Sequence, residues 1–181
     1  MRPIVIKVGG SLFDLSDLGT RLKHYLRQYQ SHTIWLVPGG GECVNTLRRL
    51  DLIHQLGELV CHDLALQLMS VNGRILHELL PDSQIIAAYD TSLPGISIVS
   101  AVEFCRHDEM LEKSWRVTSD SIALRIGQVV DAQRLILLKS FGANDFIDWP
   151  DAAQRGWVDA AFPELIRQGK PLPIDIVHFR P

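Results

Sequence analysis

The chain has 181 residues, of which 46% are hydrophobic and 22% charged, and its formal net charge is −3. This length and composition indicate one globular domain (1–181) that buries a core without a metal or disulfide staple. They exclude collagen, coiled coil and intrinsic disorder, and the slightly negative charge argues against an extended nucleic-acid surface, which needs a basic field.

Alternating apolar runs and amphipathic stretches predict strands that alternate with helices. The expected elements, in chain order, are strand 4–8, helix 15–29, strand 33–37, helix 42–50, a long helical stretch 54–80 with a weak point at Asn72-Gly73, strands 84–88 and 95–100 joined by 89–94, helices 101–111 and 118–130, strand 134–138, loop 140–151, a partly helical segment 152–168 and strand 174–178. This order predicts an α/β fold, a three-layer αβα sandwich with a mainly parallel open sheet.

Cysteine usage and the N-terminus bear on the compartment. The three cysteines are odd in number and none forms a C-x-x-C pair, which favours a reducing setting over a zinc site or disulfide framework. The N-terminus lacks the pattern of a signal peptide, and no apolar run approaches the roughly 20 residues of a membrane span. We therefore expect a soluble cytoplasmic protein.

The first strand carries a lysine and ends in a glycine pair. Lys7 interrupts an apolar run, and Gly9, Gly10 and Ser11 follow it. Glycines allow close approach to backbone N–H groups, and a lysine supplies a point charge for a phosphate. A phosphate site is one interpretation; an edge-strand lysine in water, followed by an ordinary turn, is the other.

A second glycine run, Gly39-Gly40-Gly41, follows the second strand and precedes a helix. Such a loop is typical of a site where something approaches the backbone closely, although a tight turn explains it equally well. It is not the dinucleotide-binding fingerprint, because that motif's third glycine is absent. It is not a P-loop either, because no G-K-[ST] follows the glycines.

Two polar segments complete the candidate site. Thr118-Ser119-Asp120-Ser121 opens a helix, and four polar residues exceed what a cap needs, so Asp120 is a candidate to orient lysines or to lie near Mg²⁺. Lys139 and Ser140 follow a strand directly, with Gly142 two residues on. Ligands of open α/β sheets bind at the carboxyl ends of strands, so these features together favour a phosphate site.

Other polar residues are interpreted conservatively. No two of His54, His62 and His77 stand at i, i+4 spacing, which argues against a metal site. Arg48 and Arg49 are expected mainly on a solvated helix face, with contact to an anionic substrate as the alternative.

Four segments, in order, resemble motifs of the amino acid kinase family, which includes aspartate, acetylglutamate, uridylate and isopentenyl phosphate kinases. They are 4–11, with I-V-I-K-V-G-G-S; 37–41, with V-P-G-G-G; 117–123, with V-T-S-D-S-I-A; and 135–143, with L-I-L-L-K-S-F-G-A. Within the family, the short chain and its W-x-V-T-S-D-S-I-A segment most resemble the small methanofuran-biosynthesis kinase branch and its relatives in C1-metabolising bacteria.

The resemblance implies an amino acid kinase fold, shortened at its C-terminal side, that uses ATP and Mg²⁺ and forms a homodimer or a larger homo-oligomer. It implies a catalytic role for Lys7 at the transferring phosphoryl group and for Asp120 in organising the lysine. By the same resemblance, the ATP-binding residues are Gly9, Gly10, Ser11, Lys139, Ser140 and Gly142, and the acceptor-binding residues are Gly39, Gly40, Gly41 and Ser119; no protein residue is assigned to a metal.

We therefore expect an ATP-dependent kinase acting on a phosphate, phosphomonoester or carboxylate acceptor, with an aminomethylfuran phosphate as one candidate. The alternative is a catalytically impaired protein of this fold that binds a ligand or serves in assembly. Two differences favour the alternative: the family's V-D-G is Ser140-Phe141-Gly142 here, with Asp145 left open as a substitute, and the late glycine-rich segment with a second lysine has no clear counterpart.

Overall fold

The computed structural model describes residues 2–87, 94–142 and 148–180. Its strands form one six-stranded sheet in which every described pair is parallel. In spatial order they are β3 (Gln84–Ile86), β4 (Ile96–Val99), β2 (Ile34–Pro38), β1 (Ile4–Val8), β5 (Arg134–Lys139) and β6 (Ile174–His178). The predicted mainly parallel open sheet is confirmed.

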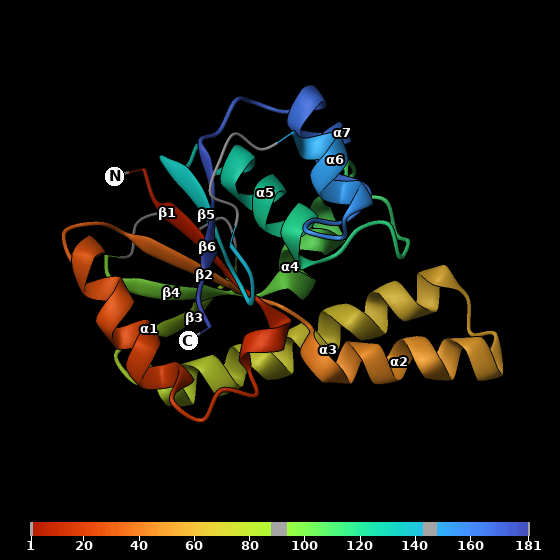
Figure 1. Cartoon of the computed structure of the whole chain (residues 1–181), viewed down its shortest axis with the longest axis horizontal. Helices are drawn as coiled ribbons and strands as arrows, with labels where there is room; N and C mark the ends of the chain where they lie inside the picture. Colours follow the sequence, from red (N-terminus) through yellow and green to blue (C-terminus); the bar gives the residue numbers. More distant parts are fainter. Residues whose placement is uncertain (1, 88–93, 143–147, 181) are drawn as a thin grey trace.

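Helices cover both faces of the sheet (Figure 1). The α-helices are α1 (Leu18–Leu26), α2 (Gly41–His54), α3 (Glu58–Leu79), α4 (Ala101–His107), α5 (Ser119–Val129), α6 (Trp149–Gln154) and α7 (Phe162–Gln168); the 3₁₀ turns are η1 (Gly10–Leu12) and η2 (Arg27–Tyr29). The α1 helix and the end of α3 pack on one face, while α4 to α7 pack on the other. This is the predicted three-layer αβα arrangement.

The pleat of β1 places Lys7 on the α5 side of the sheet. Ile4, Ile6 and Val8 belong to the apolar cluster under α1, whereas Val5 belongs to the cluster under α5. Because side chains alternate along a strand, Lys7 points the same way as Val5. The first strand therefore turns its charged side chain toward the start of α5.

The strand order also fixes where the glycine loops lie. From β1 the chain builds the sheet outward through β2, and it later returns to place β5 on the other side of β1. The carboxyl ends of β1 and β5 therefore flank the point at which the sheet changes its direction of growth, where ligands of open α/β sheets bind. Gly9 lies directly after β1 and Ser140 directly after β5.

The predicted helical stretch 54–80 is wrong at its start and in its weak point. The chain breaks at 55–57, where Gln55 and Gly57 have positive φ values of 51° and 87°, and α2 and α3 form a hairpin that extends from the body of the molecule (Figure 1). The helix α3 instead runs unbroken through Asn72 and Gly73.

Smaller differences occur at other boundaries. The helix predicted over 101–111 ends at His107, and α6 begins at Trp149, inside the predicted loop 140–151. Most of the predicted connection 89–94 and the candidate Asp145 lie outside the described residues.

Candidate active site

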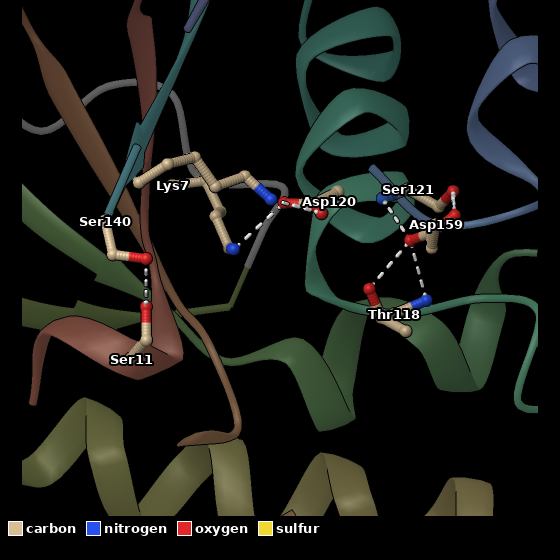
Figure 2. Close-up of polar contacts among 8 residues, drawn as sticks. Lys7, Ser11, Thr118, Asp120, Ser121, Ser140 and Asp159 are labelled. Carbon is tan, nitrogen blue, oxygen red and sulfur yellow. Dashed lines mark hydrogen bonds and ion pairs between the residues drawn. The ribbon is translucent and has the colours of Figure 1, made fainter. Parts of the chain in front are cut away.

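A buried cluster of three charges lies at the carboxyl edge of the sheet. The Lys7 Nζ lies 2.9 Å from Oδ1 of Asp120, and the Lys139 Nζ lies 2.6 Å from Oδ2 of the same carboxylate. Lys7 comes from β1 and Asp120 from the first turn of α5 (Figure 2), while Lys139 is the last residue of β5. No more than 8% of any of the three is exposed. One carboxylate thus pairs with two ammonium groups, a contact that supports the predicted role of Asp120 in orienting lysines.

The pKa values follow from this arrangement. Burial alone would raise the pKa of Asp120, but the Lys7 and Lys139 ammonium groups outweigh burial and lower it. Burial and the positive charge of Lys7 lower the pKa of Lys139 to about 8. Two ammonium groups and one carboxylate give the cluster a formal net charge of +1, so it attracts an anion.

The two glycine loops pack backbone against backbone. A Cβ atom on Gly10 would lie 2.2 Å from the Gly41 nitrogen, and one on Gly39 would lie 2.5 Å from the Gly10 nitrogen. Gly41 has a φ of +62°, which favours glycine. The Asn72 side chain of α3 donates a hydrogen bond of 2.6 Å to the Gly39 carbonyl, which ties the second loop to the helix behind it.

These loops leave N–H groups for a ligand. Gly9 and Gly39 donate their N–H groups to the Leu138 and Val8 carbonyls and so join the loops to the sheet. Gly10 and Ser11 open η1, while Gly41 opens α2, and the first N–H groups of a helix have no acceptor within it. The loops can therefore surround phosphate oxygens with N–H donors.

Ser11 and Ser140 join the ends of β1 and β5. The Ser11 hydroxyl donates to the Ser140 hydroxyl at 3.3 Å (Figure 2), and Gly142 lies against β6, where an added Cβ would be 3.0 Å from the His178 Cβ. The structure thus brings the predicted ATP-binding residues to one edge of the sheet, beside Lys7 and Lys139.

A cavity of about 640 Å³ opens next to this edge, between the α2–α3 hairpin and the start of α5. Of the residues predicted to bind the acceptor, Gly40, Gly41 and Ser119 line it, whereas Gly39 does not. Ser11 also lines the cavity, so the glycine loops and the cavity adjoin.

The far wall of the cavity contains an arginine and a tryptophan in contact. The Arg48 guanidinium lies 4.8 Å from the centroid of the Trp115 ring, and the Trp115 indole N–H donates to Asp51 at 2.9 Å. His62, which is buried, also lines the cavity, while Arg49 does not and instead contacts Thr46. Nothing in the sequence context of Trp115 showed that it faces a cavity.

Sequence reasoning missed Asp159, which lies between α6 and α7. Its carboxylate accepts hydrogen bonds from the N–H and hydroxyl groups of both Thr118 and Ser121, on either side of Asp120 (Figure 2). Asp159 follows Thr118 by 41 residues and belongs to no motif, so no signal in the sequence connects the two.

The described residues fit ATP better than they fit a metal held by protein ligands alone. They contain no group of three His, Cys, Asp or Glu side chains that could hold a metal ion, and both Asp120 oxygens face lysines. Mg²⁺ is commonly bound through substrate phosphates and water. The loops and lysines suit the phosphates that would bring it.

A parallel sheet with two glycine loops and a buried Lys–Asp–Lys cluster at its carboxyl edge defines a phosphate-binding α/β protein. The model of the amino acid kinase family matches residues 2–142, and the chain belongs to that family. It is a phosphotransferase, as the kinase interpretation predicted.

Individual proteins resemble the chain in sequence or in fold. The chain is 29% identical over 191 aligned positions to the [5-(aminomethyl)furan-3-yl]methyl phosphate kinase of Methanocaldococcus jannaschii, covering 92% of this chain and 83% of the relative. UMP kinases of Archaeoglobus fulgidus and Bacillus anthracis share the fold, with TM-scores of 0.71 and 0.67 and a sequence identity of 13% in each case. Each alignment covers 98% of this chain, and it covers 90% of the Archaeoglobus fulgidus chain and 87% of the Bacillus anthracis chain. Within the described part of the chain, none of the helices combines the length and the hydrophobicity that a membrane-spanning helix requires.

Proposed function

We propose that the protein transfers the γ-phosphoryl group of ATP to the phosphate of a small phosphomonoester, and that the acceptor is an aminomethylfuran phosphate. The observation that carries the proposal is the Lys7–Asp120–Lys139 cluster beside two glycine loops and a cavity. The relative from Methanocaldococcus jannaschii, named as a kinase of such an acceptor, supports the choice of substrate.

The residues suit in-line transfer between two anions. Each lysine ammonium has three N–H donors; Lys139 donates one to Asp120, and Lys7 forms an ion pair with the same carboxylate, so donors of both ammonium groups remain for phosphate oxygens. Two fixed positive charges offset the negative charge that gathers as donor and acceptor phosphates approach. Mg²⁺ bound with ATP would neutralise part of the same charge.

We assign the ATP phosphates to the side of β1 and β5, where the predicted nucleotide-binding residues gather: Gly9, Gly10, Ser11, Lys139, Ser140 and Gly142. We assign the acceptor to the cavity, beside the predicted acceptor-binding residues Gly39, Gly40, Gly41 and Ser119. Ser11 lies both on the nucleotide side, beside Ser140, and in the cavity wall. This position supports the division, because the ATP phosphates and the acceptor phosphate must meet where the two sides adjoin. The resulting product would be a diphosphate of the acceptor.

The proposal includes self-association in the cytoplasm. Apolar side chains stand exposed on the α2–α3 hairpin, which supports contact with a second copy of the chain. The three free cysteines suit a reducing compartment.

The test is turnover of Mg-ATP by the purified protein with [5-(aminomethyl)furan-3-yl]methyl phosphate, followed as ADP release and as the diphosphate product. UMP and aspartate, tested alongside, represent nucleotide and carboxylate acceptors. We expect the furan phosphate to have the highest kcat/KM; a higher value for either other acceptor would refute the proposed substrate.

The role of Lys7 is tested with Lys7→Ala, for which we expect a fall in kcat of about 100- to 1,000-fold, the usual cost of losing one group that stabilises transition-state charge. The matched control is Lys23→Ala on the exposed side of α1, which should retain wild-type kcat. Full turnover by Lys7→Ala would remove Lys7 from the mechanism.

A further inference from the structure

The start of α5 is held by a residue outside the region that the family model matches. The family match ends at residue 142, whereas Asp159 lies between α6 and α7. Thr118, the residue before α5, makes no capping hydrogen bond of its own, and its hydroxyl donates to Asp159 at 2.8 Å instead. The carboxylate of Asp159 thus replaces a local cap.

The hydrogen bonds of Asp159 fix the backbone on both sides of Asp120. The Thr118 and Ser121 N–H groups donate to one carboxylate oxygen of Asp159 at 2.8 and 3.0 Å, and Asp120 lies between these two anchored residues. Because Asp120 must present one oxygen to each lysine, a small rotation of this turn would lengthen at least one of the two ion pairs.

Asp159 is not held by a cation. Among the described residues no lysine, arginine or histidine forms an ion pair with it, so the donors of Thr118 and Ser121 and the positive end of α5 balance its charge. Burial and the neighbouring Asp120 charge raise the pKa of Asp159, which shows that its position beside Asp120 has an energetic cost.

Two other contacts hold the Asp159 segment in place. The Ala161 N–H donates to the Arg116 carbonyl at 3.1 Å, and the Arg116 guanidinium lies 3.7 Å from Glu164 of α7. The segment after α6 therefore lies along the residues that lead into α5.

We propose that Asp159 is a positioning residue for phosphoryl transfer: by anchoring the turn at Thr118 and Ser121, it keeps the Asp120 carboxylate between the Lys7 and Lys139 ammonium groups. Asp159 does not line the cavity, so it acts through Asp120. The proposal concerns the kinase activity proposed above, but the geometry that carries it does not depend on which acceptor is used.

The first test measures Lys139 directly and needs no substrate. In protein with ¹³C-labelled lysine side chains, an NMR titration follows the ammonium signals, and Lys139→Arg assigns the signal of Lys139. The charged groups that face Lys139 are Lys7 of β1 and Asp120 of α5. In Asp159→Asn, Asp120 should move out of contact, and the pKa of Lys139 should fall by about one pH unit below its wild-type value, since a neighbouring opposite charge commonly shifts a pKa by that much or more.

The second test is kinetic and uses Mg-ATP with the furan phosphate. Misplacement of a catalytic group by about 1 Å can cost about 100-fold, so Asp159→Asn should lower kcat by about 10- to 100-fold with little change in the KM of the acceptor. The matched control is Asp151→Asn, which makes the same chemical change at the exposed Asp151–Arg155 ion pair of α6 and should change neither kcat nor the Lys139 pKa more than slightly.

The outcomes separate the two proposals. If wild-type protein does not phosphorylate the furan phosphate, the proposed function fails, and the titration still decides the role of Asp159. A Lys139 pKa that is unchanged in a folded Asp159→Asn variant overturns the positioning role, even if the melting temperature falls. If that variant does not fold, Ser121→Ala, which removes one hydroxyl donor, should give a smaller shift of the same sign, and no shift would overturn the proposal.

Discussion

The three charges of Lys7, Asp120 and Lys139 share one buried space, and each depends on the other two. A lone buried lysine would lose its proton, and a lone buried carboxylate would gain one. Here the two ammonium groups lower the pKa of Asp120, and Lys139 keeps a pKa of about 8 in spite of its burial. Breaking a buried pair by removing one partner commonly costs about 3–5 kcal/mol, so Asp120 contributes to stability as well as to orientation.

The lowered pKa of Lys139 predicts how activity depends on pH. An ammonium that stabilises phosphate charge must be protonated, and the free protein loses that proton as the pH rises through about 8. Since kcat/KM reports the ionisation of the free enzyme, we expect kcat/KM for ATP to fall above about pH 8. The measurement is kcat/KM between pH 6 and 10.

Lys139→Arg is the control for this prediction. A guanidinium stays protonated throughout the range, so any activity that the variant keeps should no longer decline near pH 8. An unchanged alkaline decline in Lys139→Arg would assign the titration to another group.

The sequence alone could identify the three charged residues because each stands in a local pattern: a lysine in an apolar strand, a polar helix start and a lysine at a strand end. Asp159 could not be found this way, because its contact with Thr118 exists only once α5 and the segment before α7 pack together. Pairings between segments distant in sequence are set by packing and leave no local pattern.

At the scale of elements, the two glycine loops show why glycine occurs where it does. Gly10 and Gly41 approach through their backbones, which no side chain would permit. Gly73 is different: it lies in α3 facing Pro38 and Ile98, and an added Cβ would meet them at 3.6 and 3.4 Å, which is ordinary contact.

This difference predicts opposite effects of the same substitution. Gly10→Ala should separate the loops, lower the free energy of unfolding by about 1–3 kcal/mol, as overpacking does, and weaken ATP binding. Gly73→Ala should raise the free energy of unfolding by about 0.5–1 kcal/mol, because alanine favours a helix interior over glycine. Urea denaturation measures both energies, and calorimetry measures ATP binding. Equal destabilisation by both variants would contradict the close packing of the loops.

The same residues explain the error in the predicted helices. Asn72-Gly73 looks like a break in a helical pattern, yet Gly73 packs within α3 against Pro38 and Ile98, and Asn72 reaches the Gly39 carbonyl. The true break at 55–57 depends on Gln55 in a left-handed conformation. Gln55 has no strong preference for that conformation, so the break could not be predicted from composition.

At the scale of the molecule, the alternation of strands and helices was enough to predict a parallel three-layer fold, because parallel strands require crossovers. The projection of the α2–α3 hairpin was not predictable, because an apolar residue in a helical stretch does not by itself show whether it lies in a core or at the surface. In the structure Leu52, Ile53 and Leu59 are 83%, 69% and 68% exposed.

These exposed side chains predict the state of the protein in solution. Contiguous apolar surface on a soluble protein commonly marks an interface, and a standard interface covers about 800 Å² on each partner. We expect sedimentation velocity to show a dimer or a larger assembly, and we expect the double variant Leu52→Glu with Leu59→Glu to sediment as a monomer with an unchanged melting temperature. The control is Met110→Glu, which adds a negative charge at an exposed apolar position outside α2 and α3 and should leave the assembly intact. A wild-type chain that stays monomeric at every concentration tested would contradict this, and the apolar hairpin would then need a different partner.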